Sequence, residues 1–343
     1  MTALVSVAGV AIAALFAVGW VVATADSAPN LKDLAPHAAH PPSAVYAADG
    51  SLLGYIHTDT LYTPVPTWRL PLKLKQATVA IEDRRFYQHG PLDYQGIIRA
   101  GIRDVFGKSN TLQGASTLTM QLVDNLYLDG TRYAEHHDLK YKITQAKLAE
   151  QLWKARSKDW ILNSYLGNVP YGTVGGQTAI GVGAAAQMFF NKPVWQLDLA
   201  QMATLAGLPQ APSEYNPFLR PALAKTRRDQ VLQAMVSAHY ISQDEASQAE
   251  TEPLGVQHST QYTIKREPYI FDYVVQQLDQ KLCPQHPGRC SQVNNGGLKI
   301  YTTIDPKIED EATQAVLNHQ PGGPNLDDQP AAALASVDAA TGH

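Results

Sequence analysis

A long uncharged stretch at the N-terminus constrains this chain most. Residues 2–25 contain no charged side chain and are rich in Ala, Val, Leu and Ile. A helix rises about 1.5 Å per residue, so this stretch would reach about 36 Å and exceed the roughly 30 Å hydrocarbon core of a bilayer. Residues 1–25 are therefore predicted to form a transmembrane anchor. A cleaved signal peptide is the alternative, because Ala23-Thr24-Ala25 fits a small-residue cleavage site.

The remaining sequence changes character twice. Residues 26–42 combine prolines with Ala-His pairs and show neither helical nor strand periodicity, which predicts a tether. Residues 43–245 are predicted to form the main domain, and it begins with a hairpin around Asp49-Gly50. Residues 246–343 are predicted to form a linker followed by the start of an α+β unit.

Helical periodicity dominates the main domain, which predicts a mainly α fold. The expected helices cover residues 72–87, 94–106, 116–126, 138–166, 181–190, 197–208 and 221–239. Towards the C-terminus, residues 297–304 and 331–338 alternate as strands do, and residues 306–318 have the period of a helix.

Charge and cysteine content narrow the class of protein. Residues 68–160 hold 15 Lys and Arg against 10 Asp and Glu, a net charge of +5, whereas the rest of the chain carries −9. This asymmetry favours an anionic ligand or surface near the middle of the chain. Two cysteines are too few for a disulfide framework. Cys283 and Cys290 can close a small loop if their domain lies outside the cytoplasm.

The most polar segment is Glu82-Asp-Arg-Arg-Phe-Tyr-Gln-His89, at the end of an expected helix. Two acids, two cations and a histidine within eight residues are too polar for a core face. They fit an anionic ligand with a reacting hydroxyl, because cations hold phosphate while a carboxylate with a raised pKa exchanges a proton. A solvated helix end with local ion pairs is the structural alternative.

Two further segments carry polar side chains. Residues 113–121 form a glycine turn in which Ser116 can cap a helix, leaving Thr and Gln side chains free to face a ligand. Lys142 and Gln145 are spaced to share one helix face. His136-His137 has no second ligand pair at metal spacing, so a solvated loop is expected there.

These motifs together resemble the peptidoglycan glycosyltransferases of glycosyltransferase family 51, which form the N-terminal half of class A penicillin-binding proteins. The family's Glu-Asp-x-x-Phe-x-x-His motif is matched by Glu82, Asp83, Phe86 and His89, and its second motif by residues 114–121. The resemblance implies a lysozyme-like α-helical domain with a small membrane-associated lobe. It also makes residues 246–343 a linker and the start of a truncated transpeptidase-type domain.

The family joins the disaccharide units of lipid II into glycan strands, with inversion and release of undecaprenyl pyrophosphate. The resemblance implies that Glu82 is the base and that Gln145 occupies a second catalytic position. The substrate-binding residues that it implies are Asp83, Arg84, Arg85, Phe86, His89, Ser116, Thr117, Gln121 and Lys142.

The implied partners are lipid II, the growing glycan strand, the lipid membrane and proteins of cell-wall synthesis, with no nucleic acid. The implied location is the plasma membrane, crossed once, with the catalytic domain on the extracytoplasmic side. A divalent cation, Mg or Mn, is the candidate cofactor, although no residues form a metal motif of their own.

Several positions depart from the family pattern. The third motif, Arg-Lys-x-x-Glu, reads Tyr141-Lys142-Ile-Thr-Gln145 here, so its Arg and its acid are absent. Asp124 stands where Lys is usual, and Gly167 and Gly183 replace Asn and Glu. These departures make a catalytically weakened relative, which binds lipid II or glycan as a scaffold, the alternative function.

Two other activities are disfavoured. A hydrolase of the lysozyme type needs a second carboxylate to activate water or form a covalent intermediate, and the sequence offers none in a suitable place. The chain also has no Ser-x-x-Lys and no Lys-Thr-Gly. It is therefore predicted to have no transpeptidase activity.

Overall fold

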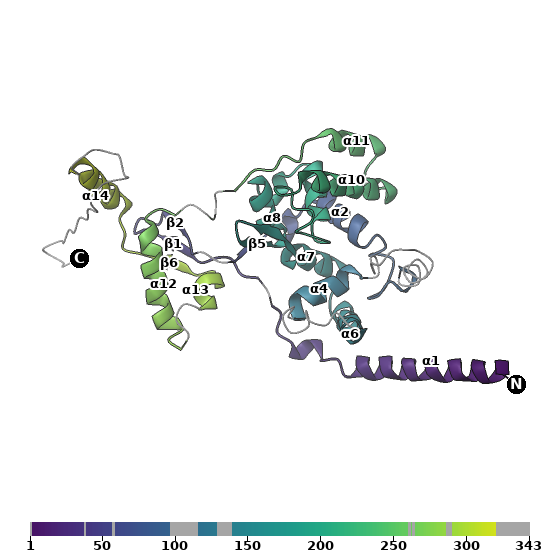
Figure 1. Ribbon diagram of the computed structural model, residues 1–343. Coiled ribbons are helices and arrows are strands. Elements are labelled where there is room, and N and C mark those ends of the chain that lie inside the picture. The colour runs from purple at the N-terminus through teal and green to yellow at the C-terminus, as the bar shows by residue number, and fades with distance from the viewer. Residues whose placement is uncertain are drawn as a thin grey trace. The chain divides into compact units, whose positions relative to one another are not determined.

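The computed structural model describes residues 2–37, 39–56, 59–96, 116–128, 139–259, 262, 265–285 and 290–319 (Figure 1). The expected helix beyond residue 96, the His136-His137 loop and the strand over residues 331–338 lie outside these ranges. Contacts divide the chain into two compact units. Unit 1 comprises Met1–Pro41 and Thr58–Gln261, and unit 2 comprises Pro42–His57 and Tyr262–His343.

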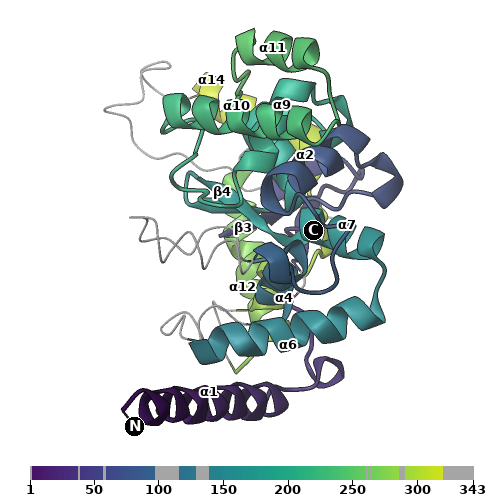
Figure 2. The same cartoon turned by 90° about the vertical axis from the view of Figure 1, so that its right-hand side faces the viewer.

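The N-terminal part of unit 1 is a long helix followed by irregular chain. Helix α1 (Thr2–Asp26) contains the uncharged stretch, and a single 3-10 turn, η1 (Leu31–Asp33), interrupts the predicted tether. Helix α1 lies beside α6 (Leu139–Ala155), as Figures 1 and 2 both show. Among the described residues, no helix combines the length and the apolarity that a membrane crossing requires.

Helices build the rest of unit 1, and the expected mainly α fold is confirmed. They are α2 (Leu72–Glu82), α4 (Leu118–Tyr127), α6, α7 (Lys158–Asn168), α8 (Gly181–Phe190), α9 (Leu199–Gly207), α10 (Pro221–Ser237) and α11 (Gln243–Thr251), with 3-10 turns η2 (Thr67–Arg69) and η3 (Val194–Gln196). Helix α2 packs against α9 and α10, and α4 packs against α6 and α7 (Figure 2). Buried alanines, including Ala77, Ala80, Ala203 and Ala206, line the first of these contacts. Their small side chains let the helices approach closely and bring Glu82 near α10.

Two predicted helices end earlier than expected. The single helix expected over residues 138–166 is wrong, because Ser157 begins a new helix by accepting a hydrogen bond from the amide of Trp160. The chain therefore forms α6 and α7 instead. Helix α2 stops at Glu82 rather than at residue 87, because Asp83 leaves the helical conformation, with φ −153° and ψ 71°.

A small sheet completes unit 1, and the sequence did not predict it. Its strands are β3 (Thr60–Tyr62), β4 (Pro170–Val174) and β5 (Gln177–Ile180), in the order β3-β5-β4. Strand β5 pairs parallel to β3 and antiparallel to β4. Gly175 and Gly176 both have positive φ in the tight turn between β4 and β5. The sheet leads directly into α8.

Unit 2 joins residues from near the start of the chain to residues from its end. The expected hairpin is confirmed as β1 (Ala44–Tyr46) and β2 (Leu52–Tyr55), and β1 also pairs in parallel with β6 (Lys299–Tyr301). The helices of this unit are α12 (Pro268–Leu282), α13 (Ser291–Asn295) and α14 (Pro306–His319). The hairpin, placed by the sequence with the main domain, thus shares a sheet and a core with C-terminal residues.

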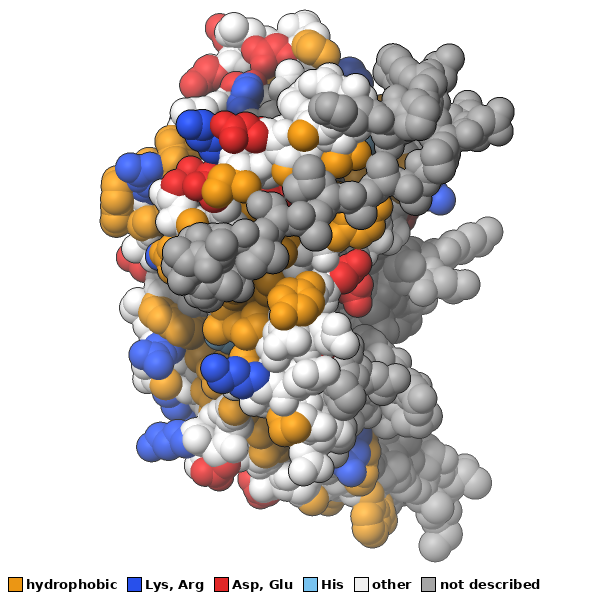
Figure 3. All heavy atoms as spheres, turned by 90° about the vertical axis from the view of Figure 1, so that its left-hand side faces the viewer, with side chains coloured by type: hydrophobic (Ala, Val, Ile, Leu, Met, Phe, Trp, Pro, Cys, Tyr) orange, Lys and Arg blue, Asp and Glu red, His pale blue; other side chains and the backbone are white. Residues whose placement is uncertain are grey.

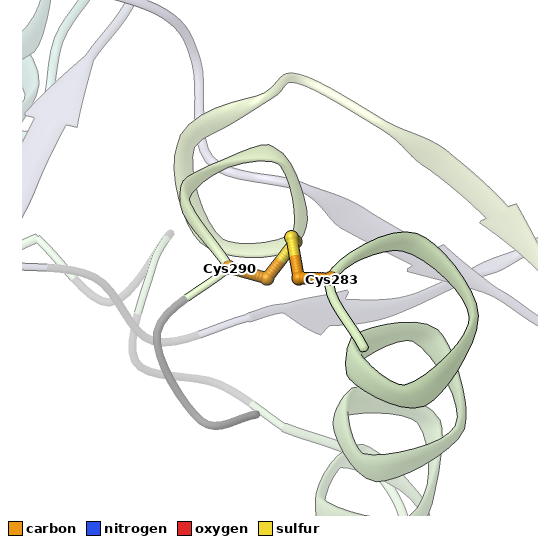
Figure 4. The surroundings of a disulfide bond; sticks show 2 residues. All are labelled: Cys283 and Cys290. Atoms are coloured by element: carbon orange, nitrogen blue, oxygen red, sulfur yellow. A yellow bond between two sulfur atoms is a disulfide. The ribbon is translucent and has the colours of Figure 1, made fainter. Parts of the chain in front are cut away.

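The predicted disulfide is confirmed in unit 2. Cys283 directly follows α12 and Cys290 directly precedes α13, and the two are bonded with their Cα atoms 5.6 Å apart (Figure 4). The bond ties the ends of the two helices together.

On the face shown in Figure 3, basic and acidic side chains are interspersed among apolar ones, so neither sign of charge forms a continuous field over the described residues there.

Candidate active site

Glu82 is the last residue of α2, and its side chain is only 7% exposed. One carboxylate oxygen, Oε2, accepts a hydrogen bond of 3.1 Å from Nε2 of Gln121 on α4. The other amide atom of Gln121, Oε1, accepts a hydrogen bond of 3.0 Å from the hydroxyl of Tyr165 on α7. A chain of two hydrogen bonds across three helices therefore fixes one side of the carboxylate.

The second oxygen of Glu82, Oε1, is in a different situation. It lies 3.6 Å from Nη2 of Arg227 on α10, close enough for an ion pair, and has no hydrogen-bond partner among the described residues. Arg227 is itself held by the carbonyl of Gly207, at 3.2 Å, and by the ring of Tyr215 beneath its guanidinium. One oxygen of Glu82 is thus held by a hydrogen bond, and the other is buried beside the guanidinium of Arg227 without a hydrogen bond.

Burial has the largest effect on the pKa values of Glu82 and the tyrosines near it. It raises the pKa of Glu82, and the hydrogen bond from Gln121 and the charge of Arg227 only partly oppose it. Burial and the charge of Glu82 also raise the pKa of the Tyr165 and Tyr171 hydroxyls. A buried carboxyl with a raised pKa is a candidate for general acid-base catalysis.

Asp83, the next residue, is buried and fully paired. Its Oδ1 lies 2.7 Å from Nε2 of His89, and its Oδ2 accepts a hydrogen bond of 3.1 Å from the amide of Leu118, the first residue of α4. A carboxylate at a helix N-terminus also interacts favourably with the helix dipole. Asp83 therefore joins the turn after α2 to the start of α4.

Both nitrogens of the His89 imidazole lie within hydrogen-bond distance of an oxygen. Nε2 contacts Asp83, and Nδ1 lies 2.6 Å from the carbonyl of Gly90. Burial disfavours the imidazolium, but the hydrogen bond and the charge of Asp83 outweigh it and raise the pKa of His89. Lys158 of α7 donates to the carbonyls of Phe86 and His89, each at 2.8 Å. The predicted substrate-binding residues Asp83, Phe86 and His89 thus form a tightly bonded turn.

The N-cap of helix α4 lies one residue later than predicted. Thr117, not Ser116, is the capping residue: its hydroxyl oxygen accepts from the amide of Met120 and donates to the carbonyl of Pro91, at 3.2 and 3.0 Å. Through its bond to Pro91, Thr117 also anchors the chain that follows His89. Ser116 is half-buried beside it.

The two predicted arginines have different surroundings. The guanidinium of Arg85 forms hydrogen bonds with Asp93 and Gln95. Arg84 is exposed. Arg85 is therefore tied into the protein, whereas Arg84 faces outward.

Lys142 and Gln145 share one face of α6, as predicted. Nζ of Lys142 donates to Oε1 of Gln145 at 3.0 Å, and Nε2 of Gln145 donates to the carbonyl of Met120 at 3.2 Å. Gln145 is 1% exposed. Because Met120 directly precedes Gln121, helix α4 connects the Lys142 pair to the partner of Glu82.

A divalent cation does not fit the side chains at these positions. Within the described ranges, no group of three or more His, Cys, Asp or Glu residues could hold a metal ion. Gln145 stands at the family's acidic position, but its amide oxygen is neutral and already accepts from Lys142.

Comparison with known proteins identifies the family of this chain. Residues 49–236 match the family model described as Transglycosylase. The chain belongs to the transglycosylase family. The resemblance to the glycosyltransferase region of class A penicillin-binding proteins is thereby confirmed, and every candidate site residue lies within the matched range.

Among the relatives of this transglycosylase chain are two penicillin-binding proteins. It is 36% identical to penicillin-binding protein 1A of Escherichia coli (strain K12) over 278 residues, which are 81% of this chain and 31% of that protein. It is 34% identical to penicillin-binding protein 2D of Bacillus subtilis (strain 168) over 319 residues, which are 90% of this chain and 42% of that protein. The chain thus spans less than half the length of these relatives.

A solved structure also matches, the crystal structure of penicillin-binding protein 1A from Haemophilus influenzae. The identity is 25% and the TM-score 0.46, over 82% of this chain and 30% of that chain.

The structure explains one departure from the transglycosylase pattern. At Gly183, where the family usually has Glu, a Cβ atom would lie 2.2 Å from the carbonyl oxygen of Thr63. The segment after β3 therefore occupies the space that a side chain would need.

The sequence did not point to Tyr165 and Arg227, which both lie near Glu82. A signal was present for Arg227. It lies on the buried face of α10 with Ala224, Val231 and Met235, where a charged side chain needs a partner.

Proposed function

We propose that the chain is a membrane-anchored peptidoglycan glycosyltransferase that polymerises lipid II into glycan strands. The observation that carries this proposal is the buried carboxyl of Glu82, which has a raised pKa, one oxygen bonded to Gln121 and one oxygen without a hydrogen bond. Membership of the transglycosylase family supports the reaction class. The reaction inverts the anomeric carbon because a single displacement forms the new bond.

The mechanism assigns each step to a group near Glu82. The acceptor sugar hydroxyl attacks the anomeric carbon of the growing strand while Oε1 of Glu82 takes its proton. The bond to the pyrophosphate oxygen breaks, and undecaprenyl pyrophosphate leaves with the electron pair. Gln121 keeps Oε2 in place, and the charge of Arg227 favours the carboxylate form that accepts the proton.

Positive charge for the leaving pyrophosphate comes from Lys142 and Arg84. Gln145 holds the ammonium of Lys142 through its amide oxygen, so we assign Gln145 a positioning role. The exposed Arg84 is free to approach a ligand from solvent. Cations placed where negative charge develops stabilise the transition state.

We place this domain on the extracytoplasmic side of the plasma membrane, anchored by a single crossing. The uncharged sequence of α1 supports the anchor. The bond between Cys283 and Cys290 supports an oxidising compartment, where disulfides persist. Both lipid-linked substrates would then lie beside the catalytic domain.

A scaffold that binds lipid II or glycan without turnover is the second candidate. One observation favours it: the acids that the family usually carries at two positions are replaced by Gln145 and Gly183, and Thr63 closes the space beside Gly183.

Incubation of detergent-solubilised protein with labelled lipid II distinguishes the two candidates. We expect the wild type to form glycan polymer and Glu82→Gln to form none. A wild type that binds lipid II but yields no polymer would overturn the enzyme in favour of the scaffold.

A further inference from the structure

Gln121 lies between the proposed base and a buried tyrosine, and its amide can bond to them in two orientations. In the observed orientation, Nε2 donates to Oε2 of Glu82 at 3.1 Å, and Oε1 accepts from the hydroxyl of Tyr165 at 3.0 Å. A half-turn of the amide would instead point its oxygen towards Glu82 and its NH2 group towards Tyr165. The orientation of the amide therefore decides whether Glu82 receives a donor or an acceptor.

Only the observed orientation suits an ionised Glu82. A carboxylate accepts hydrogen bonds and donates none, so an amide oxygen turned towards it would repel it. A protonated carboxyl has a hydrogen to donate, and the reversed amide would accept it. The observed orientation therefore favours the form of Glu82 that can take a proton, and the reversed orientation would favour the form that cannot.

Tyr165 supplies the donor that the observed orientation needs at its other end. Its side chain is fully buried, and burial raises the pKa of its hydroxyl well above the ordinary value, so the hydroxyl keeps its proton. It gives that proton to Oε1 of Gln121. In the reversed orientation the hydroxyl would face the NH2 group and lose this acceptor, which is unfavourable in the interior. Tyr165 therefore selects the observed orientation.

Other charged and titratable groups lie near Glu82 on α10, on β4 and in the chain after α2. The charge of Arg227, whose Nη2 is 3.6 Å from Oε1, lowers the pKa of Glu82, and the charge of Asp83 raises it. Tyr171 on β4 is as buried as Tyr165, and the charge of Glu82 raises the pKa of its hydroxyl too. The Tyr171 hydroxyl has no hydrogen-bond partner among the described residues. The two tyrosines therefore differ in whether the hydroxyl is bonded.

We propose that Tyr165 is a positioning residue for the base: its hydroxyl fixes the orientation of the Gln121 amide and so keeps Glu82 in the form that accepts a proton. The proposal rests on the function proposed for Glu82 and adds a residue that bonds to the partner of the base and not to the base itself. It also gives Gln121, which the sequence predicts to bind substrate, a role in supporting the base.

The pH dependence of lipid II polymerisation tests the role of Tyr165. In Tyr165→Phe the amide is free to turn, so the protonated carboxyl gains a partner. The acidic limb of the rate profile should therefore move up by about half to one pH unit. The Michaelis constant should stay within about 2-fold of the wild type, because the Tyr165 side chain is fully buried.

Tyr171→Phe is the matched control. It removes a hydroxyl that is equally buried and has no hydrogen bond among the described residues, so its rate profile should match that of the wild type. No shift in Tyr165→Phe would overturn the proposal. Equal shifts in the two variants would also overturn it, because they would show a general effect of packing.

A double-mutant cycle determines whether the effect of Tyr165 passes through Gln121. Gln121→Met removes the hydrogen bond that lowers the pKa of Glu82, so its profile should also move to higher pH. When Tyr165→Phe is added to Gln121→Met, no further shift is expected, because no amide remains to be oriented. A further shift of the same size as in the single variant would overturn the proposal.

Denaturant unfolding tests the proposal without turnover. A carboxyl whose pKa is raised in the folded protein lowers stability as the pH rises from the ordinary value of 4.5 towards the folded value. Tyr165→Phe raises the pKa of Glu82 further, so its loss of stability should be larger at pH 8 than at pH 5. In a Glu82→Gln background the loss should be the same at both pH values.

The unfolding result separates this proposal from the proposed function. A loss in Tyr165→Phe that grows with pH supports the role of Tyr165 even if the chain makes no polymer. A loss that is equal at pH 5 and pH 8 with Glu82 in place would overturn it, whether or not the chain is active.

Discussion

Glu82 and Asp83 are neighbours in the sequence, but they belong to two differently built regions. Glu82 faces α4, α7 and α10, where one of its oxygens accepts a hydrogen bond and the other has none. Asp83 faces the turn that ends at His89, where both of its oxygens are bonded. The end of α2 separates them, because the helical conformation stops between the two residues. The proposed base thus keeps one oxygen without a hydrogen bond, whereas both oxygens of Asp83 are used to hold the fold.

The largest expected effect is on catalysis by Glu82→Gln. We expect polymerisation to fall by a factor on the order of 10² or more, because an amide cannot take the acceptor proton. The free energy of unfolding should fall, because the largely buried guanidinium of Arg227 loses its charged partner. Initial rates with labelled lipid II and denaturant unfolding check both. Glu311→Gln, on the exposed α14, is the matched control; equal loss in both variants would contradict the assignment.

Asp83→Asn tests the architectural half of the comparison. An asparagine has one acceptor oxygen for the two donors, His89 and the amide of Leu118, so one buried donor loses its partner. We expect the free energy of unfolding to fall by about 2–4 kcal/mol. Urea denaturation measures the loss, with Asp244→Asn in the exposed first turn of α11 as the control. A stability like that of the wild type would show that the Asp83 bonds are dispensable.

For Gln145→Glu, the family pattern and the packing of this chain predict different results. Restoring the family's acid predicts increased glycan synthesis on sequence grounds alone. The structure predicts no increase and a loss of stability of about 1–3 kcal/mol at neutral pH, because a carboxylate cannot donate to the carbonyl of Met120.

The loss in Gln145→Glu should shrink at low pH. The protonated form of the carboxyl can again donate to the carbonyl of Met120. Unfolding at pH 5 and pH 8, with polymerisation measured alongside, checks this. Higher synthesis with unchanged stability would contradict the positioning role of Gln145.

The smallest expected effect is a shift in the pH dependence of polymerisation by Arg227→Met. The charge of Arg227 lowers the pKa of Glu82, against the larger effect of burial. Removing that charge should move the acidic limb of the rate profile up by about one pH unit at most. Lys225→Met removes a charge from the exposed side of the same helix and serves as the control. A profile that does not move would show that Arg227 does not act on Glu82.

Local patterns predicted several of the helices and the spacing of some candidate site residues. The helix over residues 181–190 has the bounds expected from its apolar residues, and the hairpin around Asp49-Gly50 forms as its turn demands. The pairing of Lys142 with Gln145 follows from helical spacing alone. The position of Glu82 near a helix end was also visible in the sequence.

The features that the sequence did not predict depend on contacts between residues far apart in the chain. Strands β3, β4 and β5 are three to five residues long, too short for an alternating pattern to be recognised, and β3 pairs with β5 across more than 100 residues. The role of Asp83 depends on the amide of Leu118, 35 residues away. Thr117 caps α4 instead of Ser116 because of a bond to Pro91.

The pH dependence of lipid II polymerisation by the wild type tests most directly the claim that Glu82 is the base. The base must be ionised, and its pKa lies above the ordinary value of 4.5. The initial rate should therefore fall as the pH drops through an apparent pKa above 4.5, and Glu82→Gln should stay inactive at every pH. A wild-type rate that is constant down to pH 4.5, or a Glu82→Gln variant that polymerises at the wild-type rate, would contradict the assignment.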